Sequence, residues 1–152
     1  MNLTYIVENE RKLDVVIKQL APTLNHQQIL FIEGEVGSGK TTFVRHLLQI
    51  LAERSNSNFF FQGSPTYQRE NQYHFDKFHF THFDFYQVEN NSNIDLEDYL
   101  LDQCLLIEWP LDNLKKRYEH EALFIKINVE LEKRVIEISS KDNQWLQKIQ
   151  SA

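Results

Sequence analysis

The sequence predicts an α/β domain in three layers, in which helices cover both sides of a central, mostly parallel sheet that includes an antiparallel hairpin. Three observations lead to this prediction. Short apolar runs alternate with helical periodicities along the 152 residues. A glycine-rich segment joins one apolar run directly to one amphipathic helix. Three of the four glycines in the chain lie in that segment, which indicates a backbone that bends sharply and approaches a ligand closely.

The glycine-rich segment is a complete phosphate-binding pattern, G-x-x-x-x-G-K-T, read from Gly34 to Thr41. The apolar run 29–32 before it suits a buried strand, and residues 41–51 after it carry apolar side chains at helical spacing. Strand, loop and helix in this order are the context that the motif requires. The sequence therefore predicts a P-loop NTPase fold with a nucleotide-phosphate site.

The elements before and after the loop follow from periodicity and from turn residues. A helix is expected over 8–21, with Leu13, Val16, Ile17 and Leu20 on one face, followed by a strand at 28–33 and a helix from about 40 to 53. Phe59, Phe60 and Phe61 are expected to form a short buried or strand segment. A β-hairpin is expected over 67–86, with its tip at Asp76-Lys77.

The second half of the chain is expected to complete the sheet. Residues 95–101 predict a short helix, and Leu105 to Glu108 predict a buried strand that ends in an acid. Residues 122–129 and 133–139 alternate as strands do. The last element is expected to be a helix around Trp145 and Ile149. We expect residues 1–152 to form a single domain built around the P-loop.

Composition excludes several classes of function. The net charge is −6 and no basic face is apparent, so direct binding of RNA or DNA is not expected, nor is binding to an anionic membrane. The beginning of the chain lacks the features of a signal peptide, and no apolar run approaches the length of a membrane span, so a cytoplasmic protein is expected. Cys104 is the only cysteine and is expected to be a buried apolar residue.

The loop predicts the chemistry of its own residues. The expected nucleotide-binding set from this segment is Glu35, Val36, Gly37, Ser38, Gly39, Lys40, Thr41 and Thr42. Backbone N–H groups hold the β-phosphate, and the ammonium of Lys40 neutralises β- and γ-phosphate oxygens. The hydroxyl of Thr41 is the expected Mg²⁺ ligand. Thr42 either donates to the α-phosphate or caps the helix.

Two acids are candidates for the remaining roles. Glu108 ends the apolar run 105–107, and Asp84 lies near the end of the aromatic strand in the hairpin. One of them is expected to hold Mg²⁺ through its waters, and the other to orient the attacking water. His79 and His82 point to opposite faces of a strand, so a role in packing or in support of the site is expected for them rather than a transition-metal site.

The ordered motifs resemble the TsaE family, also called YjeE. The resemblance covers residues from about 28 to 111. It rests on Gly34 to Thr42 and on four later segments, Gly63-Ser64-Pro65-Thr66-Tyr67, His82-Phe83-Asp84-Phe85-Tyr86, Leu96-Glu97-Asp98-Tyr99 and Ile107-Glu108-Trp109-Pro110.

The resemblance implies a small bacterial ATPase. It would act with TsaD and TsaB in making N6-threonylcarbamoyladenosine at position 37 of tRNAs that read ANN codons, and would reach tRNA only through that assembly. By resemblance, Lys40 and Thr41 take the Walker A roles, Glu108 matches the acid associated with Mg²⁺, and Asp84 matches the acid of the H-x-D-x-Y motif, so that Lys40, Asp84 and Glu108 are the expected catalytic residues. Ser64-Pro65-Thr66 then matches a switch-like segment near the γ-phosphate of ATP, and Trp109 matches a residue beside the nucleotide site.

The chain departs from the family pattern in two places. The family usually has arginine after the tyrosine of H-x-D-x-Y, whereas this chain has Gln87, and the stretch 68–70 is polar where aliphatic residues are common. A small-molecule or nucleotide kinase is the alternative function, but the six arginines are scattered and none cluster in a lid. A module that binds nucleotide without turnover is disfavoured because Lys40, Thr41, Asp84 and Glu108 are all intact.

Overall fold

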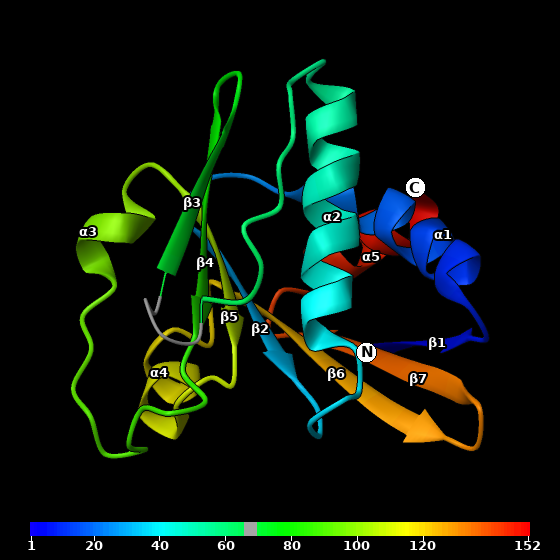
Figure 1. The fold of residues 1–152 in the computed structure, drawn as a ribbon. Coiled ribbons are helices and arrows are strands. Elements are labelled where there is room, and N and C mark those ends of the chain that lie inside the picture. Colours follow the sequence, from blue (N-terminus) through cyan, green and yellow to red (C-terminus); the bar gives the residue numbers. More distant parts are fainter. Residues whose placement is uncertain (66–69) are drawn as a thin grey trace.

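A computed structural model describes residues 1–65 and 70–152, and these residues form a seven-stranded sheet with helices on both faces (Figure 1). The strand order is β1-β7-β6-β2-β5-β4-β3. The elements are, in chain order, β1 (Asn2–Val7), α1 (Glu10–Leu20), η1 (Ala21–Thr23), β2 (Gln28–Glu33), α2 (Lys40–Arg54), β3 (Glu70–Phe75), β4 (Phe78–Asp84), α3 (Glu97–Leu100), β5 (Cys104–Glu108), α4 (Asp112–Arg117), β6 (Ala122–Glu130), β7 (Lys133–Ser140) and α5 (Asn143–Ser151).

Most strands of the sheet run in one direction. Strands β6, β2, β5 and β4 pair in parallel, and β1 shares their direction because it is antiparallel to β7, which is itself antiparallel to β6. Strands β3 and β4 form an antiparallel hairpin whose two-residue tip is Asp76-Lys77. The predicted fold class, with its mostly parallel sheet and its hairpin, is confirmed.

The sheet separates two hydrophobic cores, which confirms the predicted three layers. In β2, Leu30 and Ile32 pack in the core formed with α1, α2 and α5, whereas Ile29 and Phe31 pack in the core formed with α3 and α4. All four side chains are fully buried. Because both faces of this strand are covered, its sequence is a continuous apolar run rather than an alternating one.

Within the described residues the predicted helices and strands are present, with one exception; residues 67–69 of the predicted hairpin lie outside the described residues. Phe59 to Phe61 form no strand, and the side chain of Phe60 is 83% exposed. Phe59 and Phe61 pack against the core beside α2 while Phe60 points away from it, so the segment alternates like a strand but pairs with no strand in the described part of the chain.

Three elements were not predicted, one of which is the short 3-10 helix η1 around Pro22. The other two are β1, where Leu3 and Val7 are buried and Ile6 is exposed, and the short helix α4. In residues 1–65 and 70–152, no helix combines the length and the apolar character needed to cross a membrane.

Candidate nucleotide-binding site

The segment 34–39 connects the carboxyl end of β2 to the first turn of α2. Gly37 and Gly39 have φ values of +81° and +108°, in the left-handed region that favours glycine. A Cβ atom at Gly34 would lie 2.5 Å from both the carbonyl oxygen of Ile127 and the hydroxyl oxygen of Ser38. Local backbone geometry and close packing therefore account for the glycines that the sequence concentrates here.

Lys40 is the first residue of α2, and its side chain folds back over the loop. Its Nζ donates hydrogen bonds to the carbonyl oxygens of Gly34 and Glu35, at 2.7 and 2.9 Å. The same atom lies 4.2 Å from the centre of the Trp109 ring. Burial lowers the pKa of Lys40, although nearby carboxylates oppose that shift. The ammonium therefore lies inside the loop, at the position where a phosphate-binding loop needs its cation.

The two predicted acids lie side by side at the ends of neighbouring parallel strands. Asp84 on β4 is paired in register with Glu108 on β5, and both side chains are buried. The hydroxyl of Thr41 donates a hydrogen bond of 2.9 Å to Oε1 of Glu108. Because Ile32 at the end of β2 pairs with Glu108 on the other side, the phosphate-binding loop and both acids meet at one edge of the sheet.

Asp84 is held by residues on either side of it in the chain. Its Oδ2 accepts a hydrogen bond of 2.6 Å from the hydroxyl of Ser64, and its Oδ1 accepts one of 2.9 Å from the backbone N–H of Tyr86. Ser64 belongs to the predicted switch-like segment, which therefore reaches the site. Thr66, predicted in the same segment, lies outside the described residues.

Trp109 follows Glu108 with a left-handed backbone, at a φ of +54°. Its N–H donates to the carbonyl of Ile32, and its ring lies 4.7 Å from the ring of Tyr86. These two aromatic residues form one wall of a pocket of about 410 Å³, which is lined by Val36, Gly37, Gly39, Lys40, Thr41, Thr42, Ser64, Asp84, Tyr86, Glu108 and Trp109.

The pocket brings together most of the residues that the sequence singled out. Among the predicted residues that the structure describes, two are not on its wall, Glu35 and Ser38. The carbonyl of Glu35 accepts from Lys40, and Ser38 is buried within the loop. Of the two alternatives for Thr42, the capping role is not supported, because Gly39 occupies the N-cap of α2.

Sequence reasoning missed Arg134, a residue of β7. Its Nε donates a hydrogen bond of 2.8 Å to the carbonyl of Ser38, from 96 residues further along the chain. Arg134 also lines a second pocket, of about 260 Å³, on the other side of the loop. Ser38 and Gly39 of the loop and Thr42 of α2 line that pocket, which continues over β6, β7 and the beginning of α1. Arg134 is an isolated arginine in a strand and belongs to no sequence motif that predicts this contact.

His79 and His82 of the hairpin lie on opposite faces of the sheet, as their spacing predicts. His74 and His79 face each other across the two strands, with ring centres 3.8 Å apart. His82 is fully buried on the other face, where its Nε2 lies 2.5 Å from Oε2 of Glu108. Among residues 1–65 and 70–152, no group of three or more histidine, cysteine, aspartate or glutamate side chains is placed to hold a metal ion.

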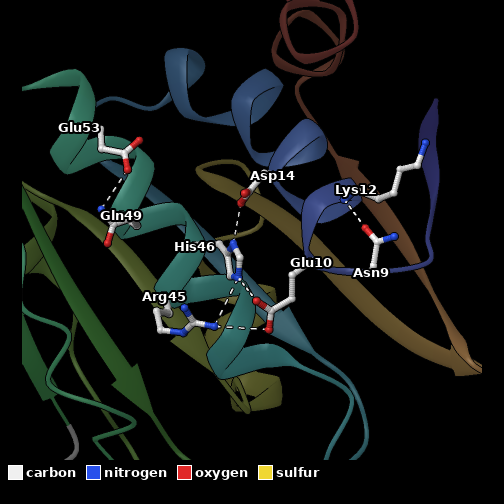
Figure 2. A network of polar contacts seen from close by, with 8 residues as sticks. All are labelled: Asn9, Glu10, Lys12, Asp14, Arg45, His46, Gln49 and Glu53. Carbon is white, nitrogen blue, oxygen red and sulfur yellow. Dashed lines mark hydrogen bonds and ion pairs between the residues drawn. The ribbon is translucent and has the colours of Figure 1, made fainter.

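A polar network joins α1 to the helix that carries the loop lysine (Figure 2). His46 on α2 contacts Asp14 through Nδ1 at 2.6 Å and Glu10 through Nε2 at 3.2 Å. Arg45 approaches Glu10 at 3.6 Å. These contacts hold α1 against α2 about one helical turn beyond Thr42.

Comparison with known proteins gives consistent matches. The family model for "Threonylcarbamoyl adenosine biosynthesis protein TsaE" matches residues 7–137. A relative from Aquifex aeolicus, named "tRNA threonylcarbamoyladenosine biosynthesis protein TsaE", is 30% identical over 104 residues, which are 68% of this chain and 74% of the relative. A protein of the same name from Borreliella burgdorferi is 32% identical over 108 residues, with the same two coverages of 68% and 74%.

A solved structure shares the fold. The crystal structure of YdiB from Bacillus subtilis superposes with a TM-score of 0.75, covering 99% of this chain and 93% of that one at 20% sequence identity.

Proposed function

Because the chain belongs to the TsaE family of threonylcarbamoyl adenosine biosynthesis proteins, we propose that it is an ATP-hydrolysing subunit in the synthesis of N6-threonylcarbamoyladenosine at position 37 of tRNA. In this proposal it acts in the cytoplasm with TsaD and TsaB. The observation that carries the ATPase assignment is the convergence of Lys40, Thr41 and Glu108 in one pocket, beside the glycines of the loop.

The phosphates of ATP bind where the loop meets α2. Backbone N–H groups of the loop and the N-terminus of α2 point toward them and favour negative charge. Lys40 exchanges its two carbonyl partners for β- and γ-phosphate oxygens, which are stronger acceptors because they are charged. The exchange needs little movement, since the ammonium already lies within the loop.

The donor set of Thr41 and Glu108 suits Mg²⁺, which prefers oxygen ligands and keeps several waters. A hydroxyl oxygen and a carboxylate oxygen lie 2.9 Å apart there. Mg²⁺, when bound, supplies positive charge against the β- and γ-phosphate oxygens. Thr41 binds through its hydroxyl, and Glu108 orients the surrounding waters.

Asp84 takes the second acidic role. It lies one strand further from the loop than Glu108, and its carboxylate is oriented by Ser64 and by the N–H of Tyr86. Asp84 orients the water that attacks the γ-phosphate in line. Trp109 and Tyr86 form the apolar wall on this side of the pocket.

The second pocket takes the ribose and the base. The two pockets lie on opposite sides of β2, because one is lined by residues of β4 and β5 and the other by residues of β6 and β7. A phosphate chain with its γ end near Asp84 places the α-phosphate near Thr42, which borders both pockets. Phe43 and Arg134 then lie beside the nucleoside.

The acidic balance of the chain supports the indirect route to tRNA. With a net charge of −6, the chain is repelled by a phosphate backbone unless a partner supplies basic surface. Neither DNA nor a membrane is part of the proposal.

The test is a tRNA modification reaction reconstituted from TsaD, TsaB, tRNA and the small-molecule substrates, with and without this chain. We expect repeated rounds of threonylcarbamoyladenosine formation only when the chain and ATP are both present, and loss of those rounds with Glu108→Gln. Equal product with and without the chain would contradict the proposal. Phosphoryl transfer from ATP to a small acceptor would support the alternative, a P-loop kinase.

A further inference from the structure

His82 is a fully buried histidine whose two ring nitrogens have different surroundings. Its Nε2 lies 2.5 Å from Oε2 of Glu108. Its Nδ1 is also buried and has no hydrogen-bond partner among the described residues. None of the roles derived above for ATP binding or hydrolysis uses this residue.

The surroundings determine which nitrogen carries the proton. An ionised carboxylate only accepts hydrogen bonds, so the short contact requires an N–H at Nε2. A proton on Nδ1 would leave a buried donor without an acceptor, which costs more than leaving a bare ring nitrogen there. The contacts therefore select the tautomer in which Nε2 donates to Glu108.

This donation fixes the orientation of the Glu108 carboxylate. His82 holds Oε2 from the side of β4, while Oε1 receives the hydroxyl of Thr41 at 2.9 Å. With one oxygen held at the back of the site, the other faces Thr41 and the pocket. We propose that His82 is a positioning residue, whose Nε2–H holds Glu108 in the orientation that organises Mg²⁺ with the bound nucleotide.

Aromatic residues hold the imidazole in place. The ring of Phe61 stacks on His82 with centres 6.3 Å apart, and Phe61 stacks in turn on Tyr73 at 6.4 Å. The hydroxyl of Tyr73 accepts a hydrogen bond of 3.0 Å from the N–H of Gln62. The segment before Ser64 thereby packs against the fully buried imidazole.

The proposal rests on the proposed function for the identity of the metal, but its first test does not require the metal. Long-range proton–nitrogen NMR of the wild-type protein with labelled histidine, without nucleotide or Mg²⁺, reports which ring nitrogen of His82 is protonated. We expect a proton on Nε2 and none on Nδ1. A proton on Nδ1 alone would overturn the proposal.

The second test separates positioning from general support of the fold. ADP binding is titrated with and without Mg²⁺ for the wild type, His82→Leu and His82→Gln, because glutamine retains an N–H donor of similar reach. Residues that orient a metal ligand typically contribute about 10- to 100-fold to metal affinity. We therefore expect His82→Leu to require about 10-fold or more Mg²⁺ for half-maximal strengthening of ADP binding, with little change in metal-free affinity. His82→Gln should recover much of the difference.

The outcomes distinguish the proposal from the proposed function. Unchanged Mg²⁺ dependence in His82→Leu would contradict positioning. A folded His82→Leu that loses ADP affinity equally with and without Mg²⁺ would assign His82 a structural role instead. If the wild-type protein binds no nucleotide, the proposed function fails, and the tautomer measurement still decides whether His82 orients Glu108.

Discussion

Replacing Lys40 with alanine is the most informative perturbation of the nucleotide site. The ammonium donates to two backbone carbonyls at 2.7 and 2.9 Å, and Lys40 as a whole residue is only 5% exposed. Its removal therefore affects the free protein as well as the complex. Both effects follow from the same geometry and can be measured separately.

The magnitude for binding follows from an exchange of partners. When nucleotide binds, the two carbonyl contacts of Lys40 are replaced by contacts with phosphate oxygens. The mutation therefore removes the amount by which the charge-assisted contacts with phosphate exceed the contacts with the carbonyls, about 1.5–3 kcal/mol. This corresponds to binding weakened by about 10- to 150-fold. In the free protein, the loss of the two carbonyl contacts is offset in part because the burial that lowers the pKa of Lys40 no longer opposes folding, so the free energy of unfolding should fall by less than the roughly 1–3 kcal/mol that two such contacts contribute.

Fluorescence provides the assay. Trp109 lies 4.2 Å from Lys40 and lines the pocket, so its emission should change with nucleotide. The other tryptophan, Trp145, is buried and donates a hydrogen bond to the hydroxyl of Thr23. Its emission is measured alone in the Trp109→Phe variant and is subtracted as background. Lys148→Ala, at an exposed lysine on α5, controls for the loss of one positive charge. Equal affinities in Lys40→Ala and Lys148→Ala would refute the assignment of Lys40 to the phosphates.

Three further predictions concern the loop and the hairpin. Gly34→Ala should lower the free energy of unfolding by about 1–3 kcal/mol, measured by urea denaturation, because its Cβ would lie 2.5 Å from a carbonyl oxygen of β6. Arg134→Ala should weaken ADP binding by about 1–2 kcal/mol, measured by titration, because Ser38 loses the side chain that anchors its carbonyl. Acid should destabilise the fold through His79, whose pKa is lowered, first by burial and then by His74. Its neutral form is favoured in the fold, so unfolding titrations should show stability present above about pH 6.5 and lost as pH falls through the lowered pKa.

Each of these predictions has a matched comparison. A Cβ at Gly37 would meet nothing within 4 Å, so Gly37→Ala should show only the cost of its left-handed backbone, about 1–2 kcal/mol. For Arg134, an exposed arginine such as Arg11 provides the charge control. His79→Gln should reduce the acid sensitivity, and an identical pH profile in that variant would exclude His79 as its source.

Local patterns explain why the sequence predicted so much of the site. The phosphate-binding motif specifies backbone and side chains within eight residues, from Gly34 to Thr41. Asp84 and Glu108 could be predicted because each ends an apolar strand, and parallel strands bring their carboxyl ends to one edge of the sheet. The hairpin tip at Asp76-Lys77 followed from alternation on both sides of a two-residue turn.

The features that were missed depend on contacts between distant segments. Arg134 reaches Ser38 from β7, and the contact of His82 with Glu108 depends on the register of β4 against β5. The pairing of β1 with β7 joins the two ends of the chain. The run of phenylalanines from Phe59 to Phe61 is typical of a strand, but a strand forms only beside a neighbouring segment whose backbone groups are free to pair with it.

Phosphate release from ATP tests the central claim most directly. We would measure it for the purified chain alone and with a TsaD–TsaB pair, using Lys40→Ala as the inactive control. We expect weak turnover by the chain alone, a several-fold increase with the pair, and loss of both in the variant. Turnover that is unchanged by the pair, or that persists in Lys40→Ala, would contradict the central claim.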